Sequence, residues 1–264
     1  MAAETPVVEC KGLTKRFGSI VAVDSVDLDI RGSEVLALIG DNGAGKSTLV
    51  KMICGAIQPD MGEIFLQGEL VSFETPHEAR MRGIETIWQD LALAPSLDVA
   101  GNLYVGREVV YGRLPRILGL LNRRAMARGA EERLRGLEIS LPAISGVPVA
   151  NLSGGQRQAV AIARAAAWAT DALMMDEPTA ALGVKQSQAT LELARSVAAR
   201  GLAVVLITHN LPHVMQYADR IVVLRHGRKV ADLPRSDATP ERLVSLIVGF
   251  ESAPEDGEQR EQHE

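Results

Sequence analysis

The sequence has little of several residue types, and each scarcity excludes a class of protein. Only two of its 264 residues are cysteine, Cys10 and Cys54, which is too few for a framework of disulfide bonds. The net charge of −5 gives no electrostatic reason to expect nucleic-acid binding or a polybasic membrane anchor. No apolar run approaches the roughly 20 residues of a membrane span. Residues 1–6 have no basic flank and no apolar segment, so we expect no secretory signal.

The chain instead contains short apolar runs that alternate with helical patterns, which predicts an α/β fold with a largely parallel sheet. Four runs are apolar throughout, as buried strands are: Val35–Ile39, Ile84–Ile87, Ala172–Met175 and Ala203–Ile207. Four others alternate apolar and polar residues, which predicts a half-exposed antiparallel sheet: Val7–Cys10, Val26–Ile30, Glu63–Leu66 and Val71–Phe73. A late hairpin is expected at Ile221–Leu224 and Lys229–Leu233.

Helical patterns are clearest at Lys46–Ala56, Arg123–Gly136, Gly154–Trp168, Val184–Ala199 and Glu241–Val248. Residues 91–169 contain no strand pattern, so we expect a helical segment inserted into the α/β core. We expect the folded domain to span residues 5–250. The acidic stretch 251–264 is expected to be disordered.

A glycine-rich loop follows the first buried run and precedes a helical pattern. It matches G-x-x-x-x-G-K-[ST] in the strand–loop–helix context that this phosphate-binding pattern requires. Its glycines allow backbone N–H groups to converge on phosphate oxygens, and the helix N-terminus adds partial positive charge. Lys46 is expected to reach the β and γ phosphates, and the hydroxyl of Ser47 is expected to bind Mg²⁺. The predicted nucleoside-triphosphate site consists of Gly40, Asp41, Asn42, Gly43, Ala44, Gly45, Lys46, Ser47 and Thr48.

Polar residues follow three other buried runs, at the sheet edge where α/β proteins bind ligands. Asp176 and Glu177 follow the run that starts at Ala172. We expect Asp176 to hold Mg²⁺ and Glu177 to polarise the attacking water as general base. His209 follows the next run and could hydrogen-bond the γ-phosphate. Gln89 offers a neutral oxygen that can reach Mg²⁺ or water, and an ordinary loop glutamine is the alternative.

A second anion-binding pattern opens the helix predicted at Gly154–Trp168. Ser153 is a good N-cap, and the two glycines after it expose the first-turn N–H groups. Capping alone needs only Ser153, whereas a glycine pair lowers helix propensity. Because one P-loop already holds the phosphates of one nucleotide, we predict that the second pattern contacts the nucleotide of another subunit in a two-fold dimer. The residues of this second site are Ser153, Gly154, Gly155 and Gln156.

In this order the motifs resemble those of the ATP-binding-cassette (ABC) ATPases, from about residue 7 to residue 249. Gly40–Thr48 is similar to the Walker A loop, Met174–Glu177 to the Walker B run with its base, and Leu152–Gln156 to the signature. The resemblance implies a RecA-like P-loop NTPase core with an antiparallel β subdomain and an inserted helical subdomain. It also implies ATP and Mg²⁺ as cofactors and ATP hydrolysis as the activity.

The resemblance gives further roles to single residues. Gln89 is similar to the Q-loop glutamine and His209 to the switch histidine. Phe17 stands where the family stacks an aromatic ring on adenine, and a turn-packing aromatic is the alternative. One position departs from the family. After Pro178–Leu182 the family usually has an aspartate that crosses the dimer interface, but this chain has Gly183, so a non-hydrolytic regulatory module stays open as an alternative.

A membrane role would require separate permease subunits, because the chain contains no span. Leu91–Leu103 lies where the family receives a permease's coupling helix, and ordinary helical core is the alternative. With Gly106–Glu108 and Ala180–Val184 this stretch resembles single-cassette subunits of bacterial simple-sugar importers. That resemblance implies a second copy of the chain, integral-membrane permeases and an extracytoplasmic solute-binding protein, with this chain in the cytoplasm on the inner face of the cell membrane. A soluble ABC-type ATPase acting on nucleic acid or ribosomes is the competing interpretation.

Overall fold

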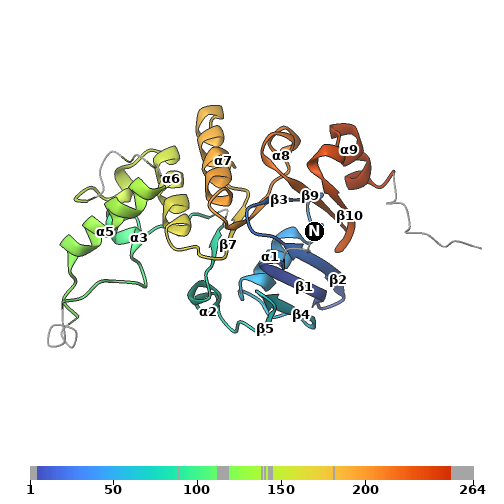
Figure 1. Cartoon of the computed structure of the whole chain (residues 1–264), viewed down its shortest axis with the longest axis horizontal. Helices are drawn as coiled ribbons and strands as arrows, with labels where there is room; N and C mark the ends of the chain where they lie inside the picture. The colour runs from blue at the N-terminus through green and yellow to red at the C-terminus, as the bar shows by residue number, and fades with distance from the viewer. Residues whose placement is uncertain are drawn as a thin grey trace, which may run out of the picture.

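The computed structural model describes residues 5–88, 90–111, 119–137, 139, 141, 145–180 and 182–250. In these residues the strands form two sheets (Figure 1). The core sheet has the order β10-β9-β3-β8-β7-β6, and the second sheet has the order β2-β1-β4-β5. Neighbouring strands of the core sheet are parallel except for the β9–β10 hairpin. The predicted α/β class with a largely parallel sheet is confirmed.

The core sheet contains the four predicted buried strands and the late hairpin. Its strands are β3 (Val35–Ile39), β6 (Ile84–Ile87), β7 (Ala172–Asp176), β8 (Ala203–Ile207), β9 (Arg220–Arg225) and β10 (Arg228–Pro234). Every residue of β3, β7 and β8 is buried, because helices or the second sheet cover both faces. In β3, for example, Leu36 and Leu38 pack toward the second sheet, and Ala37 and Ile39 pack on the opposite face. Uninterrupted apolar runs are therefore the correct signal for these strands.

The second sheet is antiparallel throughout and consists of β1 (Val8–Phe17), β2 (Ile20–Ile30), β4 (Met61–Leu66) and β5 (Glu69–Val71). The strand predicted at Val71–Phe73 is wrong in its bounds, because the observed strand is Glu69–Val71. Gln67 and Gly68 both have positive φ, 52° and 83°, and form a two-residue hairpin turn that pairs Val71 with Ile64. The turn therefore starts β5 at Glu69, whereas Phe73 lies beyond the strand and packs into the core.

In the part of the chain that the structure describes, the five predicted helices are present, together with three short helices that the sequence patterns do not predict. The helices are α1 (Lys46–Ile53), α2 (Pro76–Met81), α3 (Val99–Leu103), α5 (Arg123–Gly136), α6 (Gly154–Ala166), α7 (Val184–Ala198), α8 (Leu211–Tyr217) and α9 (Pro240–Val248). Helix α1 ends before the predicted Ala56, because Gly55 turns the chain with a φ of 71°. Helix α6 ends before Trp168, whose indole Nε1 donates to the carbonyl of Leu103, 2.8 Å away.

Helices α3, α5 and α6 lie together at one side of the molecule, away from the second sheet (Figure 1). Their apolar side chains form a cluster of their own around Leu103, Tyr104, Met126, Leu134 and Val160. In the described part of residues 91–169 no strand occurs, and one isolated bridge joins Val110 to Leu121. Among the described residues no helix is both long and apolar enough to cross a bilayer. The acidic stretch 251–264 lies outside the described residues.

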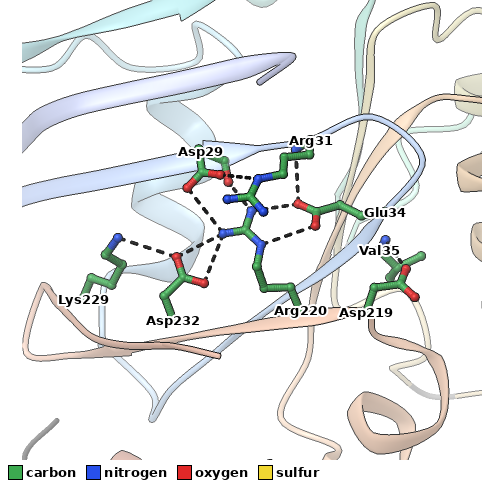
Figure 2. Close-up of polar contacts among 8 residues, drawn as sticks. All are labelled: Asp29, Arg31, Glu34, Val35, Asp219, Arg220, Lys229 and Asp232. Carbon is green, nitrogen blue, oxygen red and sulfur yellow. Dashed lines mark hydrogen bonds and ion pairs between the residues drawn. The ribbon is translucent and has the colours of Figure 1, made fainter. Parts of the chain in front are cut away.

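A buried arginine joins the two sheets (Figure 2). Arg220, the first residue of β9, is 8% exposed and forms ion pairs with Glu34 at 2.7 Å, Asp232 at 3.0 Å and Asp29 at 3.4 Å. Asp29 belongs to β2, Glu34 precedes β3, and Asp232 belongs to β10. Burial lowers the pKa of Arg220, but the hydrogen bonds that its guanidinium donates to Glu34 and the charges of the three carboxylates raise it above its ordinary value. The guanidinium therefore stays charged and links both sheets. One of its partners, Glu34, directly precedes β3, the strand that leads into the glycine-rich loop.

Candidate functional site

The glycine-rich loop joins β3 to α1 at the carboxyl edge of the core sheet. Gly40, Gly43 and Gly45 have φ values of 151°, 79° and 102°, which other residues rarely adopt. A Cβ at position 40 would also meet the carbonyl oxygen of Leu224, and one at position 45 would meet that of Ala22. Gly45 is the N-cap of α1 and supplies no side-chain acceptor, so the first-turn N–H groups are available to an anion.

Lys46 is the first residue of α1, directly after the glycines of this loop. Its side chain is buried, and its Nζ donates to the carbonyl oxygens of Gly40 and Asp41, both at 2.9 Å. Burial lowers the pKa of Lys46, and the charges of Glu177, Asp176 and Asp41 oppose that shift. The carboxylates at the end of β7 therefore lie within electrostatic reach of the loop lysine.

The remaining loop residues line the same turn. The carboxylate of Asp41 accepts the backbone N–H of Asn42 at 2.7 Å, and its carbonyl accepts that of Ala44 at 3.1 Å. Asp41 and Asn42 are exposed, whereas Ala44 is buried. Ser47 and Thr48 occupy the first turn of α1 and are half-buried. The loop therefore exposes Asp41 and Asn42 to solvent and packs Ala44 against the rest of the fold.

Glu177 and His209 meet at the ends of adjacent parallel strands. His209 Nδ1 lies 2.8 Å from Glu177 Oε1, and the Glu177 side chain is 19% exposed. Glu177 has a φ of 51°, which is unfavourable for a residue with a side chain and costs about 1 to 3 kcal/mol. Its backbone N–H donates to the carbonyl of Ile207 at 3.0 Å, which helps to hold this turn. Strand β7 ends at Asp176, and at Glu177 the backbone turns out of the strand direction.

Two of the three predicted Mg²⁺ ligands are in the described part of the chain. Ser47 stands beside Lys46 in α1, and Asp176, 7% exposed, influences the pKa of the same lysine. A hydroxyl and a carboxylate are hard oxygen donors, and Mg²⁺ prefers a few such ligands together with substrate phosphates. The donor set therefore fits Mg²⁺. Gln89, the third predicted ligand, lies outside the described residues.

The residues of the second anion-binding pattern form a capping box at the start of α6. Ser153 Oγ accepts the backbone N–H of Gln156 at 3.3 Å, and Gln156 Oε1 accepts that of Ser153 at 2.8 Å. A Cβ on Gly155 would lie 2.8 Å from Gln186, whereas a Cβ on Gly154 would stand in open space, with no described residue outside its own helix turn within 4 Å. Packing thus explains one glycine but not the other. The tip of α6 also lies far from α1 of the same chain (Figure 1).

Phe17 is the last residue of β1 and is 51% exposed. The Nζ of Lys15 lies 5.8 Å from the centre of its ring. Its sheet reaches the glycine-rich loop through β2, because Ala22 stands against Gly45. A half-exposed ring on the sheet that borders the loop can stack on a planar base.

Gly183 is the N-cap of α7, and that helix has no side-chain cap. A Cβ at this position would lie 2.8 Å from Oε1 of Gln186, so the same glutamine packs against Gly155 and Gly183. Ala181, in the same loop, lies outside the described residues. The loop that carries an aspartate in the family therefore holds no acceptor side chain at position 183.

The stretch Leu91–Leu103 divides into two parts. Val99 and Leu103 of α3 are buried in the helical cluster, as the core interpretation predicts. Residues 96–98 instead border a cavity of about 520 Å³, together with Arg123 and Arg124 of α5. Asn102 is fully buried and holds this loop, since its side chain accepts the Ala94 N–H and donates to three backbone carbonyls.

Sequence reasoning missed two polar side chains beside the candidate site. Gln158 of α6 is 7% exposed, and its Nε2 donates to the carbonyl of Pro178 at 2.7 Å, next to Glu177. Arg164 of α6 donates to the carbonyls of Leu91 and Ala92 at 3.0 and 2.8 Å, just after Gln89 in the chain. The available signal is a polar residue on the apolar stripe of a helix, where only a paired side chain is tolerated.

Comparisons with known proteins agree with this geometry. The fructose import ATP-binding protein FrcA of Rhizobium meliloti is 47% identical over 96% of this chain and 97% of its own. The xylose/arabinose import ATP-binding protein XylG of Sulfolobus acidocaldarius is 43% identical over 92% of this chain and 94% of its own.

Solved structures show the same fold. The ATP-binding cassette MJ1267 of an ABC transporter matches with a TM-score of 0.78 at 24% identity, over 91% of this chain and 98% of that one. The ATP-binding cassette MJ0796, in a dimeric structure bound to ADP and Pi, matches with a TM-score of 0.70 at 27% identity. The match covers 86% of this chain and 98% of that one. The predicted P-loop cassette fold is therefore confirmed. The family model described as ABC transporter matches residues 23–180, and the chain belongs to the ABC transporter family.

Proposed function

We propose that this chain is the ATP-binding and ATP-hydrolysing subunit that powers import of a simple sugar by a membrane transporter. The observation that carries the proposal is the contact between Glu177 and His209, 2.8 Å apart. It lies at the sheet edge where the charges of Glu177 and Asp176 act on the pKa of Lys46. The substrate class rests on relatives that match nearly the whole chain and are named for fructose and xylose/arabinose import.

Each described residue has a task in this proposal. The backbone N–H groups of Gly40–Thr48 and the ammonium of Lys46 hold the triphosphate. Glu177 accepts a proton from the attacking water. His209 is hydrogen-bonded to the same carboxylate and fixes the orientation of that carboxylate. Phe17 stacks on the adenine ring. Ser47, Asp176 and Gln89 would hold Mg²⁺, which when bound neutralises charge on the β and γ phosphates.

The second nucleotide contact is proposed to come from another copy of the chain. The tip of α6 is remote from α1 within one molecule (Figure 1), and Gly154 has no packing partner there. In a two-fold dimer the residues 153–156 of one copy would face the P-loop of the other, with two nucleotides between them. Binding of ATP would close the pair and hydrolysis would reopen it.

Transport further requires partners that cross the membrane. We propose that permease subunits dock on residues 91–98, beside the cavity that borders α5, in a helical subdomain of about residues 91–169. The chain would then lie on the cytoplasmic face of the membrane, and an extracytoplasmic solute-binding protein would deliver the sugar. Closure of two cassettes would draw the docked permease segments together.

The test combines turnover with uptake. Wild-type chain is expected to hydrolyse Mg·ATP, and Glu177→Gln is expected to lose at least about 100-fold in kcat and to form an ATP-bound dimer by light scattering. Cells that lack the chain are expected to lose uptake of one sugar in a labelled panel, restored by the wild type but not by Glu177→Gln.

A matched control is available on α7. Glu192 is exposed, so Glu192→Gln makes the same chemical change away from the site and should behave as wild type. Normal turnover in Glu177→Gln would refute the assignment of the base. Unchanged uptake of every sugar in cells without the chain would refute the transport role.

A further inference from the structure

The turn that carries Glu177 is fastened to helix α6 of the same chain. Gln158 lies on the first turns of α6, 7% exposed, and its Nε2 donates to the carbonyl of Pro178 at 2.7 Å. Pro178 directly follows Glu177, whose φ of 51° is unfavourable for any residue with a side chain. Such a conformation persists only where neighbouring contacts hold it.

Besides the contact between the side chains of Glu177 and His209, three hydrogen bonds to backbone groups hold this turn. The N–H of Glu177 donates to Ile207 of β8 at 3.0 Å, and the carbonyl of Glu177 accepts from Ala180 at 3.1 Å. The bond from Gln158 is the one supplied by a side chain, and it comes from a different helix. Its loss would remove the hydrogen bond that the described residues donate to the buried carbonyl of Pro178, and the turn could then relax.

A second contact joins the same two segments. The side chain of Gln186 on α7 packs against Gly155 at the start of α6 and against Gly183 at the end of the loop that follows Glu177. Both glycines stand where a Cβ would lie 2.8 Å from an atom of Gln186. The start of α6 therefore contacts the residues that follow Glu177 at two points, at Pro178 through Gln158 and at Gly183 through Gln186.

We propose that Gln158 is a positioning residue for the general base: it fixes the turn of Glu177 and ties that turn to the helix whose tip serves the other nucleotide. The inference rests on the proposed function. In the dimer, contact of one nucleotide with residues 153–156 would set the position of α6. Through the hydrogen bond of Gln158 to Pro178, the position of α6 would then set the position of Glu177 in the same chain. This path does not need an acceptor side chain at position 183, where the chain has glycine.

The test replaces the amide donor with a side chain of similar shape. We expect Gln158→Met to lower kcat about tenfold with the KM for ATP within twofold of wild type, because the base is displaced while the phosphate loop is untouched. Ile162→Met is the matched control, since Ile162 is also buried on α6 but makes no polar contact with the turn. If kcat of Gln158→Met lies within twofold of the control, or if KM rises instead, the proposal is wrong.

Two further readouts separate positioning from general structural damage. In a Glu177→Gln background, Gln158→Met should cause no additional loss of residual turnover, and a full further tenfold loss would contradict the proposal. The ring signals of His209, which contacts Glu177, should shift in the NMR spectrum of Gln158→Met and stay in place in Ile162→Met. That spectrum needs no turnover, so unmoved signals overturn this inference even if the wild type hydrolyses nothing, whereas an inactive wild type overturns the proposed function.

Discussion

Replacement of Arg220 by methionine removes the one cation that three carboxylates share. The Arg220 side chain is 9% exposed, while those of Glu34, Asp232 and Asp29 are 14%, 26% and 31% exposed. Methionine keeps much of the length and apolar volume of the arginine stem, so little cavity is left. The change deletes the charge and the hydrogen bonds of Arg220 that Figure 2 shows.

The magnitude follows from the burial of the group that is left behind. Removal of one partner of a fully buried ion pair costs about 3 to 5 kcal/mol, because the other charge remains unpaired. That cost is lower here because the three carboxylates retain some contact with water, Asp29 keeps its ion pair with Arg31, and Asp232 keeps its ion pair with Lys229. We therefore expect Arg220→Met to lower the free energy of unfolding by about 2 to 4 kcal/mol at pH 7.

The loss should depend on pH in a defined direction. Burial raises the pKa of Asp29, but the charges of Arg220 and Arg31 outweigh burial and hold it below the ordinary value of 3.8. A lowered carboxylate pKa contributes stability above the unfolded pKa and loses it as the pH falls through the folded pKa. The wild type should therefore lose this contribution below about pH 4, and the difference between wild type and variant should shrink there.

Urea unfolding followed by circular dichroism, at pH 7 and at several values down to pH 3.5, measures both effects. The control is Arg31→Met, which makes the same change in charge beside the same Asp29, but from a side chain that is 50% exposed. An exposed pair contributes at most about 1 kcal/mol. If the two variants are equally stable at pH 7, or if the deficit of Arg220→Met grows toward low pH, the account of this cluster is wrong.

Three other changes test separate contacts. Lys46→Ala should weaken binding of a fluorescent ATP analogue at least about tenfold while the thermal unfolding midpoint stays near that of wild type, and unchanged affinity would contradict the phosphate role. Asn102→Ala removes four hydrogen bonds from a fully buried side chain and should destabilise the chain to urea by about 2 to 4 kcal/mol. Gly183→Asp supplies α7 with the N-cap it lacks and should stabilise the chain by a few tenths of a kcal/mol in the same assay, and a net loss would show that contact with Gln186 outweighs capping.

Local chemistry made much of the fold predictable. Runs such as Val35–Ile39 are apolar at every position because the strand is covered on both faces, so length and composition alone identify it. The helix at Arg123–Gly136 was predicted with its observed bounds. The start of β5 is also set by local sequence, at the Gln67–Gly68 turn. The alternation of apolar and polar residues at Val71–Phe73 does not reveal that turn.

Long-range pairing explains most of what sequence could not supply. Arg220 looks like the polar start of an apolar strand, and only the fold brings Asp29, 191 positions away, to its guanidinium. Gln158 resembles any helical glutamine until α6 is packed against the turn after Glu177. Short helices such as α3 form because buried Asn102 and neighbouring residues hold them, and five residues carry too little periodicity to predict.

The two glycines at the tip of α6 show how structure sharpens a motif. From sequence, the pair at 154 and 155 suggested a need beyond capping. In the fold Gly155 is explained by Gln186, and Ser153 with Gln156 forms a complete capping box, so local structure accounts for three of the four residues. Gly154 alone has open space where a Cβ would stand, and alanine there would favour the helix. The proposed dimer supplies the missing reason, because a nucleotide held by another copy must approach that backbone closely.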